Sequence, residues 1–525
     1  MQLWVLSALA SALLPWAVHG WTSAALQRSW VAAGSRSFSS QRPRSARAWW
    51  RQRHRSGARM ASSQEADLEA FWGWLTKNGV KTADTGVRAG PSTLLGGRGL
   101  VATRPITKGS TFAAVPQGLS VSASGARKSA DLWRYISGFE GWTGDTGVMA
   151  LQILWERSKG EKSRLAPWMA VLPAQGELDL PLFWGKEDLD LADASSTRGI
   201  SGLAEDVTED YAWLQQNVFG PNPGVFMPAE AFSVDAFRWA VGVVMSRSFF
   251  VDGELRLTPL VDFANHSPEA SAQEPTGGGM ALLGGRAVKL AAGRDYEEGE
   301  EVFISYGPRG GAAYLEEHGF VPEMAKADAG CELEFSLDKG DRFLDDKEDI
   351  LEINGLQPTV TFDLAAVGAP DPELIHFLRL SLLGSEDAFL LEGIFRNEVW
   401  SFMELPVSPV NEEAVDRYLR ERCASELSSL AGSEEEDDVL AGPSPPPEAS
   451  GPACLCARVR KGERLALKRT AEWCRSDLEG LQQKEYYQER RLKELNLDVP
   501  LSEDEVYDGA TSRVPGGGPG RDLDW

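Results

Sequence analysis

Short apolar runs with turn residues between them predict a strand-rich part of the chain between about residues 66 and 325. The clearest predicted strands are residues 99–102, 111–115, 287–290 and 301–304. Inside this part, at roughly 130–245, apolar residues recur every three or four positions, as in 148–157 and 234–246. This period predicts helices. Strands interrupted by a helical insert indicate an α+β domain with the insert packed on one side.

Helical patterns dominate from about residue 335 to residue 495. Residues 372–383 and 411–430 are amphipathic, and Asn411 is the predicted N-cap of the second helix. Residues 462–495 predict one long charged helix or two joined ones.

Three segments predict irregular structure. The stretch PTGGGMALLGG at 275–285 predicts a flexible loop. The stretch SEEEDDVLAGPSPPPEASGP at 433–452 is acidic and rich in proline, which predicts a loop that cannot bury a core. The glycine-rich tail at 510–525 predicts disorder, and we find no internal repeat.

Charge is distributed unevenly along the chain, whose formal net charge is −24. Residues 1–60 hold nine arginines and no acid, and the first carboxylate is Glu65, so the remainder carries −33. A body this acidic repels nucleic-acid phosphates. The composition therefore predicts no nucleic-acid partner and favours a protein substrate that presents a basic tail or loop.

The N-terminal 60 residues predict a two-part targeting leader. The first 20 form an apolar run that ends in small residues, which is typical of a signal peptide, and Pro15 and His19 make the run a poor membrane span. The next 40 have the composition of a transit peptide. Such a pair resembles the leaders of algae with secondary plastids. It predicts that the mature protein is located in the plastid stroma, has no membrane partner and folds from near Glu65. The alternative interpretations of these residues are secretion, mitochondrial import and an artefactual gene start.

The five cysteines do not predict a disulfide framework, because their number is odd and their distribution sparse. Cys454 and Cys456 form a C-x-C pair, but no second pair follows at zinc-site spacing. We therefore predict free thiols and no metal.

Three stretches place polar or glycine residues where strands end. Residues 96–116 begin with a Gly-rich turn, which lets backbone groups approach a ligand, and continue with two short strands joined by a polar turn. An apolar strand leads to Asn265 and His266, whose side chains can donate to or accept from a polar ligand. Tyr306 follows a strand and precedes Gly307-Pro308, where its hydroxyl can enter a cleft. Taken singly, these are an ordinary turn, an Asn-capped turn and a core tyrosine.

Together, in this order and separation, the three stretches resemble the SET domain. The insert sequences at 149–173 and 237–250 are similar to the subgroup of the plant Rubisco large-subunit lysine methyltransferase, which also contains an actin histidine methyltransferase. Residues 335–495 resemble that subgroup's C-terminal substrate-binding domain. The resemblance implies an α+β SET domain at 66–325, with short β-sheets, a pseudoknot-like crossing and a helical insert. An all-α C-terminal domain follows.

The resemblance also implies S-adenosylmethionine as the cofactor. Gly96 and Arg98 are expected to touch it through backbone atoms. Arg247 is expected to meet its carboxylate, since a guanidinium can bind two oxygens at once. Asn265 and His266 are expected to hold its amino or adenine end. No metal is required.

The target side chain is expected to enter a channel lined by Ser246, Phe249 and Asp262, with Tyr306 as the catalytic tyrosine. Methyl transfer from a sulfonium needs a neutral amine, whereas lysine has a pKa near 10.4. A dry channel favours the neutral form. Asp262 has the opposite effect, because a close carboxylate keeps lysine charged; we expect it to act in capture.

Two departures from the family pattern leave the target residue type open. His318 stands in the channel wall where lysine-modifying members have a second tyrosine, and Arg309-Gly310-Gly311 replaces the usual residues after Tyr-Gly. Lysine is the predicted target, and a histidine target is the alternative. A decayed SET pocket that serves as a protein-binding module is a rival from another class. A chromatin-modifying enzyme is disfavoured by the leader and by the missing zinc motif. The oligomeric state is not predicted.

Overall fold

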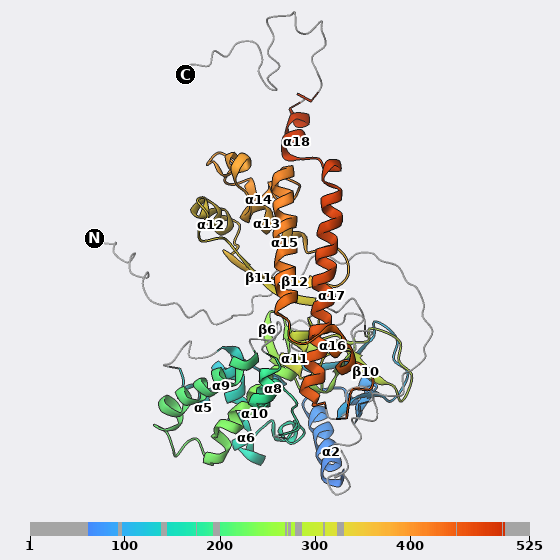
Figure 1. The fold of residues 1–525 in the computed structure, drawn as a ribbon. Coiled ribbons are helices and arrows are strands. Elements are labelled where there is room, and N and C mark those ends of the chain that lie inside the picture. Colours follow the sequence, from blue (N-terminus) through green and yellow to red (C-terminus); the bar gives the residue numbers. More distant parts are fainter. Residues whose placement is uncertain are drawn as a thin grey trace, which may run out of the picture. The chain divides into compact units, whose positions relative to one another are not determined.

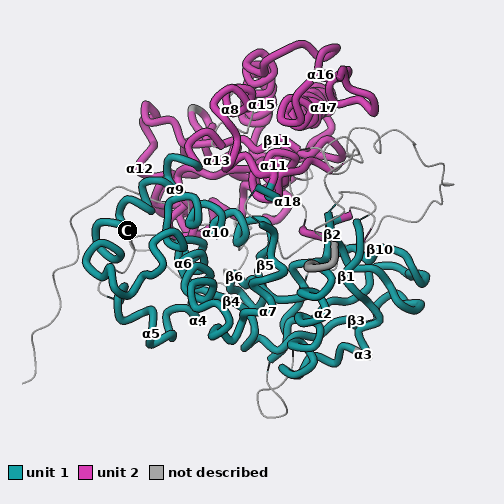
Figure 2. Tube along the Cα trace, turned by 90° about the horizontal axis from the view of Figure 1, so that it is seen from below, with its two compact units in different colours: residues 1–178, 204–266, 273–304 teal, residues 179–203, 267–272, 305–525 magenta. Residues whose placement is uncertain are grey.

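The computed structural model of the chain describes residues 61–92, 97–137, 144–174, 176–192, 200–267, 270, 275–278, 286–307, 310–322, 330–447, 449–495 and 497–498. They form two compact units, which Figure 2 draws in different colours. The first unit draws on positions up to 178, 204–266 and 273–304, and the second on 179–203, 267–272 and 305 onward. The predicted leader and tail lie outside the described residues, and the predicted domain boundaries stay a prediction.

Among the described residues of the first unit, the strands form three small sheets, and each of the four predicted runs is one of their strands. The strand orders are β1 (Val87–Pro91), β2 (Arg98–Ala102), β10 (Glu301–Ile304), β7 (Asn265–His266); β3 (Thr111–Pro116), β9 (Ala287–Ala291), β8 (Thr276–Gly278); and β4 (Val121–Ser122), β6 (Glu254–Leu257), β5 (Ser248–Val251). The prediction of a loop over 275–285 is wrong at β8, whose backbone pairs with β9.

Strand β10 organises the four-stranded sheet. It pairs antiparallel with β2 and parallel with β7, so that Phe303 faces Asn265 and Ile304 faces His266. All four residues of β10 are buried. The apolar run at 301–304 therefore fixes the Asn-His segment against the core, although the two strands are far apart in the sequence.

The predicted insert is helical: between residues 130 and 245 the described residues contain helices and no strand. These helices are α5 (Ala130–Trp133), α6 (Asp145–Ser158), α7 (Ala166–Met169), α8 (Lys186–Asp190), α9 (Ile200–Leu214) and α10 (Val234–Arg247). In the first unit α6 packs against α10, because both have a broad apolar face. The first unit also contains α2 (Ala61–Lys77), α3 (Thr82–Thr85) and α4 (Ala123–Arg127), whereas α8 belongs to the second unit.

Helices dominate the second unit, as predicted. Besides α8, these helices are α11 (Gly311–His318), α12 (Leu344–Ile353), α13 (Pro372–Ser381), α14 (Val399–Phe402), α15 (Pro409–Ser429), α16 (Glu434–Leu440), α17 (Gly451–Glu479) and α18 (Tyr487–Glu494). The long helices α15 and α17 lie side by side (Figure 1). The charged helical region predicted at 462–495 consists of two helices, α17 and α18, and α17 already begins at Gly451.

The prediction of Asn411 as an N-cap is wrong. Helix α15 begins three residues earlier, where the Ser408 hydroxyl accepts from the backbone N–H of Asn411. Asn411 is buried, and its side chain donates to the carbonyl of Arg379 at 3.1 Å. Pro409 after a serine is a favourable first helical residue, which is the signal that the sequence interpretation overlooked.

The expectation of an all-α C-terminal domain misses a two-stranded sheet. Strands β11 (Gly330–Ser336) and β12 (Thr359–Ala365) pair antiparallel over seven residues each. Burial alternates along β11, so its apolar side chains face the helical core. A strand with one buried face shows this period of two.

The acidic segment 433–452 is not wholly a loop, because residues 434–440 form α16. Ser433 and Glu436 make a capping box at its start. Asp437 is 1% exposed and accepts three hydrogen bonds from Arg460 and one from Arg464, both on α17. The arginines of α17 neutralise the acidic helix, which composition alone does not reveal.

No described helix has both the length and the apolar character that crossing a bilayer requires. All five cysteines are buried free thiols, and Cys454 and Cys456 lie within α17. Within the described ranges, no group of three His, Cys, Asp or Glu side chains is arranged to hold a metal ion.

Candidate active site

Asn265 is the centre of a polar cluster in the first unit. Its Nδ2 donates to the carbonyl of Arg98 at 3.1 Å and to Oε1 of Glu301 at 2.9 Å. Because both amide hydrogens are used within the protein, the amide oxygen is the atom that can accept from a ligand. The parallel pairing of β7 with β10 thus orients an acceptor beside the Gly-rich turn.

Gly99, the second residue of β2, can only be glycine. A Cβ at this position would lie 2.3 Å from Oε1 of Glu301 and 2.8 Å from Nδ2 of Asn265. Any side chain would therefore break the cluster. The sequence interpretation missed Glu301, whose signal is a carboxylate inside a fully buried strand.

Two guanidinium groups lie in the same unit. Arg247 is the last residue of α10, and its Nη1 donates to the backbone carbonyl of Asp262 at 2.6 Å. Its Nε is buried and has no hydrogen-bond partner in the structure. Arg98 donates to the carbonyl of Val171 at 2.8 Å and lies over the Phe263 ring. Burial and the nearby positive charge of Arg247 lower the pKa of Arg98, because both make its charged form less stable. A negatively charged ligand would offset this effect, so these two groups favour an anion.

Asp262 is buried, with 6% of its surface exposed. Trp168 on α7 donates to its Oδ2 at 3.0 Å, while Oδ1 has no hydrogen-bond partner in the structure. Burial raises the pKa of Asp262 to about 6, against the opposing effects of Arg247 and the Trp168 hydrogen bond. Two residues earlier, Leu260 has a φ of 73°, a strained value for a branched side chain. Trp168, which holds the carboxylate, was not predicted from the sequence.

The raised pKa of Asp262 predicts a pH-dependent stability. Between pH 3.8, which is the ordinary pKa of the group, and about pH 6, the folded state binds the proton of Asp262 more tightly than the unfolded state does. The contribution of protonated Asp262 to the free energy of unfolding is thus fully present below pH 3.8, and it is lost as the pH rises through about 6. In Asp262→Asn this loss is absent. Between about pH 5.5 and pH 8, urea unfolding should show wild type losing about 1 kcal/mol relative to the variant.

Asp206→Asn, on the exposed side of α9, is the matched control for removing one carboxylate. Its stability difference from wild type should stay constant over the same pH range. If Asp262→Asn also runs parallel to wild type, Asp262 does not bind a proton on folding and the argument from burial is wrong.

The other predicted first-unit residues lie on α10, β5 and β7. Ser246 donates its hydroxyl to the carbonyl of Gly242 at 2.7 Å within α10. Phe249 on β5 and His266 on β7 are buried. Gly96 lies outside the described residues, so its predicted contact stays a prediction.

Tyr306 belongs to an aromatic cluster in the second unit. Its ring centroid lies 4.6 Å from that of His318 and 6.4 Å from that of Phe320. The His318 side chain is 4% exposed, and its Nε2 lies 3.6 Å from a carboxylate oxygen of Glu317. His318, the predicted channel-wall residue, is therefore in direct contact with the predicted catalytic tyrosine.

Two glycines shape this cluster. Gly307 directly follows Tyr306 and has a φ of 94°, and its carbonyl accepts from the Tyr314 hydroxyl at 2.8 Å. Gly319 has a φ of 73°, and a Cβ there would lie 2.1 Å from the carbonyl oxygen of Asp179. The residue directly after Tyr306 and the residue directly after His318 must therefore both be glycine. Arg309 lies outside the described residues.

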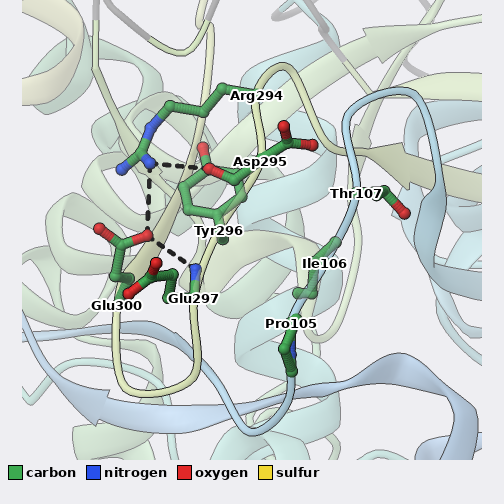
Figure 3. Close-up of a pocket in the computed structure, with 8 residues that line it drawn as sticks. All are labelled: Pro105, Ile106, Thr107, Arg294, Asp295, Tyr296, Glu297 and Glu300. Atoms are coloured by element: carbon green, nitrogen blue, oxygen red, sulfur yellow. Dashed lines mark hydrogen bonds and ion pairs between the residues drawn. The ribbon is translucent and has the colours of Figure 1, made fainter.

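Of the predicted site residues, the structure brings Arg98, Arg247, Asp262 and Asn265 together in the first unit, and Tyr306 and His318 together in the second. A surface pocket of about 440 Å³ in the first unit holds none of them (Figure 3). It is lined by residues of the turns at 105–107 and 294–300, where Arg294 bonds Glu300. This shallow surface pocket therefore offers none of the predicted chemistry.

Comparison with known proteins identifies the class. Residues 97–307 match the family described as SET domain, and residues 338–467 match the family described as Rubisco LSMT substrate-binding. The β10–β7 pairing and the Asn265 cluster thus belong to a SET domain, which a substrate-binding domain follows.

Two relatives and one solved structure place the chain more closely. It is 32% identical to the chloroplastic ribulose-1,5 bisphosphate carboxylase/oxygenase large subunit N-methyltransferase of Nicotiana tabacum, over 82% of this chain and 86% of the relative. It is 32% identical to the chloroplastic [fructose-bisphosphate aldolase]-lysine N-methyltransferase of Arabidopsis thaliana, over 83% and 89%. The crystal structure of the SET domain of LSMT bound to lysine and AdoHcy matches with a TM-score of 0.69, 31% identity and coverage of 82% and 96%. The chain therefore belongs to the SET-domain family of S-adenosylmethionine-dependent protein-lysine methyltransferases.

Proposed function

We propose that this chain methylates a lysine side chain of a non-histone plastid protein, with the residues described above as its site. The observation that carries the proposal is the first-unit cluster. The buried Nε of Arg247 has no partner, and Asn265 keeps one acceptor after donating to Arg98 and Glu301. A ligand with both a carboxylate and an ammonium group complements this pair, and S-adenosylmethionine has both.

The residues present fit the cofactor. Arg247 would hold its carboxylate through charge-assisted hydrogen bonds. Asn265 and His266 would hold its amino or adenine end, and Gly96 and Arg98 would contact it through backbone atoms. When bound, S-adenosylmethionine supplies the methyl group from its sulfonium.

The protein's own residues would prepare the lysine. Ser246, Phe249 and Asp262 would line the channel, where the burial of Phe249 and Asp262 excludes water and favours the neutral amine. Asp262 would attract the charged lysine during capture. The Tyr306 hydroxyl would then orient the nitrogen, so that positioning and desolvation provide most of the rate.

A histidine target is the second candidate, and one observation supports it. His318 packs directly against Tyr306 and replaces the second tyrosine of lysine-modifying members. An imidazole in place of a phenol changes the donors and acceptors of the channel wall. A histidine ring would need the same dry channel, so the two targets differ in channel shape rather than in mechanism.

The relatives suggest where the substrate is found. Both are named chloroplastic, and their names specify the Rubisco large subunit and fructose-bisphosphate aldolase as their targets. Together with the predicted two-part leader, these names support a stromal protein as the substrate of this chain. Either of the two proteins is a first candidate.

Incubation of the purified protein with isotope-labelled S-adenosylmethionine and a soluble plastid extract tests the proposal. Label is expected in a discrete protein band, with Rubisco large subunit and aldolase as the first bands to examine. A binding module with a decayed pocket predicts no label and no retention of S-adenosylmethionine by the protein.

A further inference from the structure

A basic pocket lies in the first unit, apart from the residues assigned to the cofactor and the channel. Its volume is about 630 Å³, and it is formed by segments of α4, α6, β4 and β6 and the turn before α7. These elements contact one another in the first unit (Figure 2). The charged residues that line it are Lys128, Lys159, Lys162, Arg164, Arg256 and Glu156.

Five cations and one carboxylate give the lining a positive charge, although the whole chain carries −24. Part of this charge is neutralised: Lys159 lies 2.7 Å from Glu156, and Arg256 pairs with Glu254 beside the pocket. Lys128, Lys162 and Arg164 are exposed and pair with no described carboxylate. Three uncompensated cations around one depression in an acidic protein favour an anionic ligand.

The floor of the pocket has unused hydrogen-bonding capacity. Glu156 is buried and accepts from Ser163 at 2.6 Å, but Oε1 of Gln152 and Nε of Arg256 are buried without a partner in the structure. Buried polar atoms normally have partners. The lining beneath the charged rim is therefore polar, which suits a polar ligand better than an apolar one.

The three exposed cations come from two segments. Lys128 follows α4, whereas Lys162 and Arg164 belong to the turn between α6 and α7. Separate positive point charges suit a row of carboxylates, while a single phosphate needs donors that converge on one point. The ligand that best matches the pocket is therefore an extended acidic polypeptide segment.

The pocket adjoins the predicted channel through one sheet. Arg256 on β6 pairs with Ser122 on β4 and with Phe249 on β5. Phe249 is a predicted channel residue, and directly paired residues lie on the same face of a sheet. A segment bound at Arg256 would therefore reach the side of the sheet that carries the channel wall.

We propose that this pocket is a docking site for an acidic segment of the protein substrate, a role that rests on the proposed methyltransferase function. The site lets a strongly acidic enzyme recruit a substrate that is itself partly acidic, and it orients the segment next to the target lysine. Because the rim cations are exposed, binding should weaken as ionic strength increases.

Fluorescence anisotropy of the full-length protein with a labelled oligoglutamate peptide tests the docking site directly. The triple variant Lys128→Gln, Lys162→Gln, Arg164→Gln should bind about tenfold more weakly, because each exposed charge contact contributes a few-fold. The double variant without the Arg164 change keeps that residue's 3.0 Å bond to the Gly118 carbonyl and should show an intermediate loss. A second triple variant, Lys77→Gln, Lys81→Gln, Lys108→Gln, removes three exposed cations outside the pocket and should bind like wild type.

Two results would overturn the docking site. One is equal peptide binding by the pocket variant and wild type. The other is displacement of the peptide by inorganic phosphate but not by chloride at equal ionic strength, which would indicate a small-anion site. Because this assay needs no methyl transfer, it is independent of the proposed activity. With a labelled substrate in hand, the pocket variant should raise KM and leave kcat unchanged; an unchanged KM rejects the docking role even if transfer itself is confirmed.

Discussion

Tyr306→Phe is expected to lower kcat for methyl transfer by about 100-fold or more, while the affinity for S-adenosylmethionine stays unchanged. The variant keeps the ring that packs against His318 at 4.6 Å and removes only the hydroxyl. If that hydroxyl orients the nitrogen for in-line attack, its loss affects the transition state and not cofactor binding. Single-turnover kinetics and calorimetry with S-adenosylmethionine measure the two quantities separately.

Tyr314→Phe is the matched control. Its hydroxyl donates to the Gly307 carbonyl at 2.8 Å within the same cluster. Removing it should cost about 1 kcal/mol of stability and leave kcat within a few-fold of wild type. Should Tyr306→Phe retain activity similar to that of Tyr314→Phe, the catalytic role assigned to Tyr306 is wrong.

Glu412→Ala is expected to destabilise the second unit by about 3–5 kcal/mol, because it leaves a buried guanidinium without its counter-charge. Both carboxylate oxygens of Glu412 accept from Arg379, at 2.7 Å and 3.0 Å, and one also accepts from Lys484 at 2.9 Å. Burial raises the pKa of Glu412, but Arg379 and Lys484 outweigh it, so the pKa is lowered overall. The stabilisation is therefore present above the ordinary pKa of 4.5 and is lost as the pH falls through the lowered value.

Hydrogen exchange of α13 and α15 measures this effect locally, so that the unfolding of the first unit does not contribute. Glu413→Ala removes the neighbouring exposed carboxylate and should change protection by less than about 0.5 kcal/mol. Equal protection in the two variants would contradict the assignment of Arg379–Glu412 as a structural ion pair of α13 and α15.

Periodicity predicted the regular elements well, because strands and helices with one buried face repeat their apolar residues with a fixed period. The runs at 99–102 and 301–304 and the helices at 148–157 and 234–246 all lie within observed elements. Capping residues predicted the start of a helix less well where two candidates lay close together. Asn411 has a good capping side chain, but Ser408 followed by Pro409 begins the helix, and Asn411 bonds Arg379 from inside it.

Features that depend on distant partners were not accessible from the sequence. Helix α16 forms in an acidic segment because Arg460 and Arg464, more than twenty residues later, neutralise Asp437. Glu301 and Trp168 become site residues only because the fold brings them to Asn265 and Asp262. By contrast, Asn265 and Tyr306 could be selected beforehand, because with the Gly-rich turn they stand in the order and separation that resemble the SET domain, although neither residue is distinctive when taken singly.

The most direct test of the central claim is tandem mass spectrometry of the plastid protein that this enzyme labels, with a deuterated methyl group on the S-adenosylmethionine. The account predicts deuterated methyl on the ε-nitrogen of a lysine with the wild-type enzyme and almost none with Tyr306→Phe. Methyl on a histidine ring nitrogen, or equal labelling by Tyr306→Phe, would contradict it.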